Sequence, residues 1–158
     1  IFNDGDLERP LRPTPWSRAH AGVFPGLDRP VGPEVWDRET RRMYFYHPEG
    51  AHLADCLEDL RPFAGEYAVC LQDKRSIQIS AAGCTKARGV QALAHRCGVS
   101  REHILCIGDS YNDISMLEYA GIGAAVSNAC AALKEAADYV SPLPCWEGVV
   151  QILQTRIP

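Results

Sequence analysis

Two carboxylates and an amide follow an apolar stretch in this chain, in an arrangement that could bind a hard cation. The apolar run 104–107 leads into Gly108 and Asp109, and Asn112 and Asp113 come shortly after. An unbroken apolar run that ends at a glycine is typical of a parallel strand buried on both faces. Open α/β sheets bind their ligands at the carboxyl ends of such strands. Carboxylate oxygens there would suit Mg²⁺, which takes one or two carboxylates and leaves room for a phosphate.

Lys86 could supply a positive charge to the same site. It stands just ahead of a predicted helix and follows Gly83 and Thr85. Its ammonium group is a compact point charge, able to neutralise a phosphate or a catalytic carboxylate. The ordinary alternatives are a solvated surface lysine at this position and simple helix-capping residues in the loop 109–113. The chemical interpretation therefore requires the fold to bring Lys86 to the strand end that carries Asp109.

The segment 81–158 shows alternating strand and helix patterns that would position these groups. We predict strands at 104–107, 124–126 and 139–140. We predict one helix that begins just after Lys86 and ends before Gly98, and further helices at 113–120, 131–137 and 146–152. In the first helix, Val90, Leu93, Ala94 and Cys97 fall on one face, which we expect to be the inner one. A strand–helix alternation of this kind predicts a parallel, doubly wound sheet.

The segment 1–80 has a different character. Its first forty residues are rich in proline and glycine, which predicts loops and short strands. A strand at 43–46, a short amphipathic helix at 53–60 and two strands at 67–71 and 76–80 follow. The fold class expected for the whole chain is therefore α/β, with a small α+β segment over residues 1–80 and a parallel core over residues 81–158.

Composition excludes several classes of partner. The chain has 158 residues and a formal net charge of −4, which argues against a nucleic-acid-binding surface. No apolar run is long enough for a membrane span, so we expect no membrane partner. The seven cysteines are odd in number and lack CxxC spacing, so we predict buried free thiols rather than disulfides or a zinc site. A reducing cytoplasm is the expected location, and the oligomeric state stays open.

Three segments together resemble a known family. The run 86–93 (KARGVQAL), the loop 108–113 (GDSYND) and the pair Asn128-Ala129 are similar to the C-terminal half of haloacid dehalogenase (HAD) superfamily phosphatases, above all the Cof-type branch with a large cap domain. The resemblance covers residues 43–158 in layout and is specific over 83–140. It implies a HAD-like parallel (Rossmannoid) core portion at 81–158, and a part of the cap domain at 1–80 that need not be complete.

The resemblance also implies a function. Phosphatases of this family attack phosphorus with an aspartate, form an aspartyl-phosphate and use Mg²⁺ to offset charge. By resemblance, Asp109 and Asp113 fall at metal positions, Lys86 and Asp113 at catalytic positions, and Lys86 and Asn112 at positions that bind the substrate phosphate. We therefore expect a Mg²⁺-dependent phosphatase whose partner is a small phosphorylated metabolite of the sugar-phosphate kind.

The chain departs from the family at the nucleophile. The family motif D-x-D-G-T is missing, and Asp4 and Asp6 only imitate it, because no Gly-Thr follows and nearby prolines exclude the expected helix. We predict that the nucleophile lies upstream of Ile1, so that these residues form half of an active site. The family's Ser/Thr strand-end motif is also missing, and Ala87 and Ser127 stand where glycine is usual.

Two other functions stay open at this point. Ser110 could be the nucleophile of an SGNH-type esterase, although no histidine follows it in the sequence to complete a triad. A truncated or degenerate HAD module could instead bind a ligand or regulate a partner without catalysis. A further expectation concerns Trp16 and Trp36, either of which could stack on a sugar.

Overall fold

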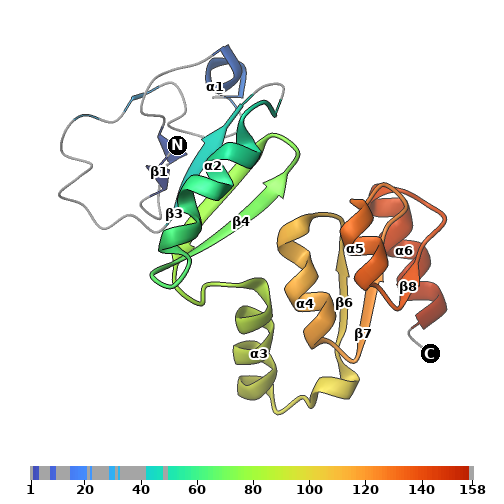
Figure 1. Cartoon of the computed structure of the whole chain (residues 1–158). Coiled ribbons are helices and arrows are strands. Elements are labelled where there is room, and N and C mark those ends of the chain that lie inside the picture. The colour runs from blue at the N-terminus through green and yellow to red at the C-terminus, as the bar shows by residue number, and fades with distance from the viewer. Residues whose placement is uncertain are drawn as a thin grey trace. The chain divides into compact units, whose positions relative to one another are not determined.

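A computed structural model describes residues 2–3, 8–9, 15–20, 22, 29–30, 32, 42–47 and 50–156. The chain divides into two compact units, Ile1–Ala82 and Gly83–Pro158 (Figure 1). Asp4, Asp6 and Trp36 lie outside the described residues, as does the side chain of Trp16, so the expectations placed on them stay predictions. Among the described residues, no helix combines the length and the apolar character that crossing a membrane would require.

The first unit is built on an antiparallel sheet in the order β2-β1-β3-β5-β4. Helix α2 lies on this sheet (Figure 1) and buries Leu53, while Ile77, on the strand between β3 and β4, is fully buried. The strands are β1 (Phe2–Asn3), β2 (Glu8–Arg9), β3 (Arg42–Tyr46), β4 (Tyr67–Asp73) and β5 (Ser76–Ala81). The helices are α1 (Pro15–His20), α2 (Leu53–Leu60) and the 3₁₀ turn η2 (Arg61–Phe63).

The second unit has a parallel sheet in the order β6-β7-β8, as the strand–helix alternation predicts. Its strands are β6 (Leu105–Gly108), β7 (Ile122–Ala125) and β8 (Tyr139–Val140). Its α-helices are α3 (Lys86–Cys97), α4 (Ile114–Tyr119), α5 (Ala131–Ala136) and α6 (Cys145–Arg156). The 3₁₀ turns η3 (Arg101–His103) and η4 (Tyr111–Asp113) come directly before β6 and α4.

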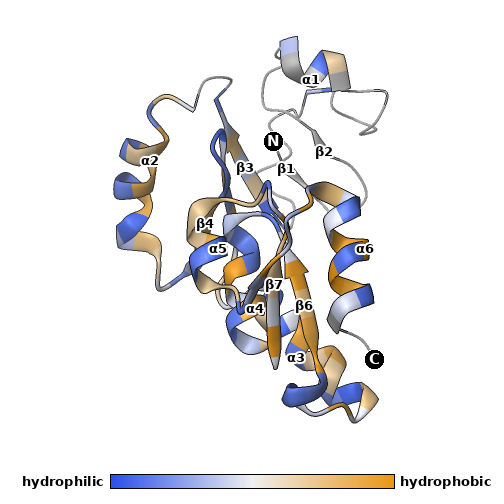
Figure 2. Ribbon diagram, turned by 90° about the vertical axis from the view of Figure 1, so that its right-hand side faces the viewer, coloured by the Kyte–Doolittle hydropathy of each residue, from blue (hydrophilic) through white to orange (hydrophobic). Residues whose placement is uncertain are grey.

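Helices cover both faces of the parallel sheet. In Figure 2, α4 and α5 lie on one side of β6 and β7, and α6 lies on the other. The core between these layers contains Leu117 from α4, Leu133 from α5 and Ile152 from α6, each at most 2% exposed. Glycine permits the close packing at β7, because a Cβ on Gly123 would lie 2.9 Å from the Leu117 backbone oxygen. This packing fixes the strand ends at which the carboxylates lie.

Several local predictions were wrong in detail. The region 113–120 is a 3₁₀ turn followed by a short helix, β7 begins before residue 124, and α6 is longer at both ends than predicted. Only Cys106 of β6 is fully buried, because β6 is an edge strand of the described sheet. The expected inner face of α3 is also only partly buried, since Leu93 is 63% exposed and Cys97 is exposed as well.

The cysteine prediction was half right. All seven thiols are free, and Cys106 is buried, but Cys84, Cys97 and Cys145 are exposed. These three stand at the ends of helices or just before one, where the chain turns at the surface and a thiol cannot enter the core.

Candidate active site

Thr85 fixes the start of α3 and thereby places Lys86. Thr85 has extended backbone angles, and its hydroxyl oxygen accepts the Arg88 N–H at 3.3 Å, which is an N-cap. Lys86 is consequently the first residue of the helix rather than a residue ahead of it. Its side chain projects from this first turn and is about half exposed (48%).

Asp113 organises the turn that leaves β6. One of its carboxylate oxygens, Oδ2, accepts the N–H groups of Asp109 and Ser110, each at 3.1 Å. The Ser110 hydroxyl oxygen in turn accepts the Asp113 N–H, so the two residues form a capping box. Gly108 is required here, because a Cβ would lie 2.6 Å from the Cβ of Asp113. Asp113 itself is 3% exposed, so its charge is enclosed by the protein.

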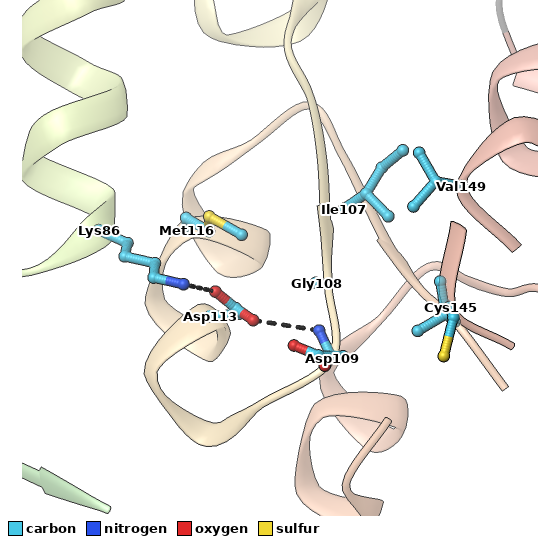
Figure 3. A pocket seen from close by; sticks show the side chains of 9 residues that line it. Lys86, Ile107, Gly108, Asp109, Asp113, Met116, Cys145 and Val149 are labelled. Carbon is cyan, nitrogen blue, oxygen red and sulfur yellow. Dashed lines mark hydrogen bonds and ion pairs between the residues drawn. The ribbon is translucent and has the colours of Figure 1, made fainter. Parts of the chain in front are cut away.

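Lys86 and Asp113, far apart in sequence, form an ion pair. The Lys86 ammonium donates to Oδ1 of Asp113, the oxygen that the two backbone N–H groups leave free (Figure 3). Every acceptor oxygen of Asp113 therefore has a donor, which a buried carboxylate requires. Asp109 differs, because its side chain is exposed. The structure therefore brings Lys86 to the loop that carries Asp109, as the chemical interpretation of the sequence requires.

A cavity of about 310 Å³ collects these groups at the end of β6. Lys86 and Met116 line one side of the strand, and Cys145 and Val149 line the other (Figure 3). The remaining lining residues are Ile107, Gly108, Asp109, Asp113 and Val126. The charged side chains therefore share one space that is wide enough for a phosphate group and open enough to admit it.

Two of the residues singled out from the sequence are not among those that line this cavity. Asn112 lies on η4 between the two aspartates, and its buried amide oxygen has no hydrogen-bond partner among the described residues. Ser110 acts as the cap of η4, and no histidine is among the residues that line the cavity with Asp109. The geometry therefore gives the esterase hypothesis no support.

The donor set can be tested for a hard cation. Asp109 presents a carboxylate to the cavity, and carboxylate oxygen is the ligand Mg²⁺ prefers. Asp113 has its oxygens occupied by Lys86 and by two N–H groups. Within the described part of the chain, no three His, Cys, Asp or Glu side chains gather as a metal cluster. Asp109 therefore fits Mg²⁺ as one ligand, with water or a phosphate free to supply others.

Cys145 and Asn128 were not assigned a role from the sequence. Cys145 lines the cavity at the start of α6, and its N–H donates to the Asn128 side-chain oxygen at 2.7 Å. Spacing gave no signal for this contact, because the two residues belong to different connections. Cys106, in β6 below the site, is inert by contrast: burial and then the charge of Asp113 raise the pKa of its thiol, so it stays protonated.

The parallel sheet, with helices on both faces and carboxylates at a strand end, defines the second unit as an α/β fold, and comparison with known proteins gives the family. The family model of haloacid dehalogenase-like hydrolases matches residues 35–153. The chain belongs to this family, which confirms both the resemblance to the HAD superfamily and its Cof-type branch and the α/β fold class.

Curated relatives match this chain over part of their length. A phosphoglycolate phosphatase of Archaeoglobus fulgidus is 48% identical over 73 residues, which is 46% of this chain and 33% of the relative. A 5-amino-6-(5-phospho-D-ribitylamino)uracil phosphatase of Bacillus subtilis is 32% identical over 120 residues, which is 76% of this chain and 48% of the relative. The chain thus spans about a third to a half of the curated relatives it matches.

Solved structures give the same picture. A haloacid dehalogenase-like hydrolase from Bacteroides thetaiotaomicron superposes with a TM-score of 0.71 and 26% identity, covering 98% of this chain and 59% of that one. A sugar phosphatase of HAD subclass IIB superposes with a TM-score of 0.68 and 25% identity, covering 87% of this chain and 53% of that one.

Proposed function

We propose that this chain supplies the charge-neutralising part of a Mg²⁺-dependent phosphatase site that hydrolyses small phosphorylated metabolites through an aspartyl-phosphate. The ion pair between Lys86 and Asp113 at the Asp109 loop carries the proposal. A surface lysine would have no reason to meet a buried carboxylate 27 residues away at a strand end. Phosphoryl transfer, in contrast, needs positioning and charge neutralisation at such a place.

Each side chain has a distinct part in this proposal. Lys86 offsets the charge of the nucleophile and of the bound phosphoryl group, and Asp113 holds its ammonium in place. Asp109 is the direct ligand of Mg²⁺, which when bound supplies positive charge at the phosphoryl oxygens. Asp113 serves the metal site by orienting the loop that carries Asp109, because its own oxygens already accept hydrogen bonds. Asn112 keeps its proposed contact with the substrate phosphate, which requires its amide to turn toward the cavity.

The reaction itself needs a nucleophile that these residues do not include. An aspartate outside residues 1–158 would attack phosphorus, and the bond from phosphorus to the ester oxygen would break as the aspartyl-phosphate forms. Water would then hydrolyse that intermediate and release phosphate. The described strand β1, which precedes Asp4 and Asp6, supports this assignment. It pairs antiparallel with β3 in the first unit rather than joining the parallel sheet of β6.

The first unit has the cap role in this proposal, and the substrate class follows from the relatives' chemistry. Phosphatases acting on phosphoglycolate and on a phosphorylated ribitylamino-uracil, and a sugar phosphatase, are among the proteins this chain resembles. Each of these names describes a small phosphate ester, but the carbon skeletons of the esters differ. We therefore propose a small phosphorylated metabolite as substrate. The seven free thiols favour a reducing compartment, and we propose the cytoplasm as the site of action.

Asp109→Asn in the intact protein tests the function. Hydrolysis of p-nitrophenyl phosphate should fall by orders of magnitude, because the substitution removes the carboxylate that holds the metal. Glu135→Gln, which neutralises an exposed carboxylate on α5, is the matched control and should keep its activity. Asp109→Asn activity within about twofold of wild type would contradict the metal assignment. An intact wild-type protein without any turnover would favour the non-catalytic module instead.

A further inference from the structure

Asn128, which has no part in the proposed reaction, joins the connection after β7 to the first residue of α6. Its Oδ1 accepts the Cys145 N–H at 2.7 Å, and the two residues are 17 positions apart. Beside this contact, the Ser127 N–H donates to the Leu143 carbonyl oxygen at 3.0 Å. Two hydrogen bonds therefore fasten the loop 126–130 to the segment that leads into α6.

The same loop holds the backbone at the exit of β6. The Cys130 N–H donates to the carbonyl oxygen of Asp109 at 2.9 Å, and the Val126 N–H donates to that of Gly108 at 3.3 Å. The loop 126–130 thus contacts the Asp109 turn through its backbone and the start of α6 through the Asn128 side chain. A displacement of α6 would be passed through this loop to Asp109.

Cys145 adopts a backbone conformation that needs support. Its φ of 47° lies in the left-handed region, which is unfavourable for a residue with a side chain. Such conformations persist where surrounding contacts impose them. The hydrogen bond from its N–H to Asn128 is one such contact, and it keeps Cys145 at the cavity, across β6 from Lys86 (Figure 3).

Close packing at the next turn of α6 supports a tightly fitted junction. A Cβ on Gly148 would lie 2.3 Å from the Leu143 carbonyl oxygen and 2.8 Å from a methyl group of Val126. The helix therefore approaches the loop more closely than any side chain at position 148 would allow. Little free space separates α6 from the loop, so a hydrogen bond at its end can determine how the two fit.

We propose that Asn128 is a positioning residue of this site. Its amide locks the first residue of α6 to the loop 126–130, and that loop in turn fixes the backbone of Asp109 beside the cavity. The catalytic consequence rests on the proposed function, whereas the positioning itself does not. Asn128 is exposed and is not itself among the residues that line the cavity, which separates this role from direct contact with a substrate.

Amide hydrogen exchange, resolved by residue with NMR, tests the positioning without any catalysis. In Asn128→Ala, the Cys145 amide should exchange roughly fivefold faster, the loss expected for one hydrogen bond, and the Cys130 amide should also exchange faster. Asn128→Asp keeps an acceptor oxygen, so the Cys145 and Cys130 amides should exchange at the wild-type rates in this variant. Gln154→Ala, which removes an exposed amide later in α6, is the matched control and should change neither.

Two exchange results would overturn the proposal. An unchanged Cys145 rate in Asn128→Ala would mean that the hydrogen bond does not hold α6. A faster Cys145 rate with an unchanged Cys130 rate would mean that Asn128 is a local helix cap that does not reach Asp109.

Kinetics of the intact protein then address the consequence for the site. Asn128→Ala should raise the Mg²⁺ concentration needed for half-maximal hydrolysis of p-nitrophenyl phosphate several-fold, and Asn128→Asp should reverse the change. An unchanged Mg²⁺ requirement alongside faster Cys130 exchange would refute the link to the metal position. Absence of turnover in the wild type would count against the proposed function alone, since the exchange rates still decide the role of Asn128.

Discussion

Asp113→Asn keeps the shape of the side chain that organises the site and removes its charge. The wild-type carboxylate accepts the Lys86 ammonium on one oxygen and the Asp109 and Ser110 N–H groups on the other. An amide has one acceptor oxygen and one donor nitrogen. In Asp113→Asn, the amide nitrogen must therefore face either the ammonium or the two N–H groups, and one set of donors loses its partner inside the protein.

The expected loss of stability can be worked from these contacts. Hydrogen bonds to a charged group contribute about 1.5–3 kcal/mol each, and breaking a buried ion pair costs about 3–5 kcal/mol. Lys86 is half exposed and regains water when the pair breaks, so the cost lies toward the lower end. We expect Asp113→Asn to lower the free energy of unfolding by about 2–4 kcal/mol. Lys86→Met leaves both N–H contacts in place and should cost only about 1–2 kcal/mol.

A double-mutant cycle with Lys86→Met separates the ion pair from the hydrogen bonds. Urea unfolding gives the four free energies, and exchange of the Asp109 and Ser110 amides reports the loop itself. The double variant should lose about 1 kcal/mol less than the sum of the single changes, because each substitution removes the same pair. Lys134→Met, on α5, is the control for loss of a lysine charge. Additive losses, or a larger loss in Lys86→Met than in Asp113→Asn, would refute the assigned contacts.

Two further predictions concern the strand that carries the site. Gly108→Ala should lower the free energy of unfolding by about 1–3 kcal/mol through its clash with Asp113, measured in urea, whereas Gly89→Ala, with open space around it, should be neutral or stabilising; equal stability of both variants would contradict this. Cys106 has a raised thiol pKa when folded, so its contribution to stability is complete below the unfolded pKa and is lost as pH rises toward the folded one. Cys106→Ala should therefore show a shallower fall in stability than wild type above about pH 9, and parallel curves would exclude the effect.

Local sequence signals were sufficient for most of the second unit. The apolar run 104–107 predicted β6 within one residue, and Thr85 and Gly98 mark the two ends of α3. Burial was harder to predict. Leu93 follows the helical period of the inner face yet is 63% exposed, because the period gives a direction around α3 but not what packs against it.

Sequence spacing could predict only those contacts of the site that join residues close together in the chain. The capping box of Ser110 and Asp113 follows from a spacing of three residues. The pairing of Lys86 with Asp113 does not follow from spacing. The sequence suggested only that Lys86 could reach the strand end that carries Asp109, and the resemblance placed Lys86 near the nucleophile and the phosphate. Asn128 and Cys145 were missed for the same reason, since their contact depends on how two connections of a folded sheet lie side by side.

Asp109 and Asp113 both follow β6, but their surroundings in the structure differ. Asp113 is buried, and its oxygens already accept hydrogen bonds from Lys86 and from two N–H groups, so its carboxylate is less available to a cation than that of Asp109. Asp109 is exposed at the cavity and offers its carboxylate without that competition. Because Asp113 holds the loop, the carboxylate of Asp109 can be kept in a fixed position before Mg²⁺ binds. Pre-organisation of this kind lowers the cost of assembling charge around a phosphoryl group. Loss of Asp113 should therefore weaken Mg²⁺ binding at Asp109, because the loop that carries Asp109 would lose its support.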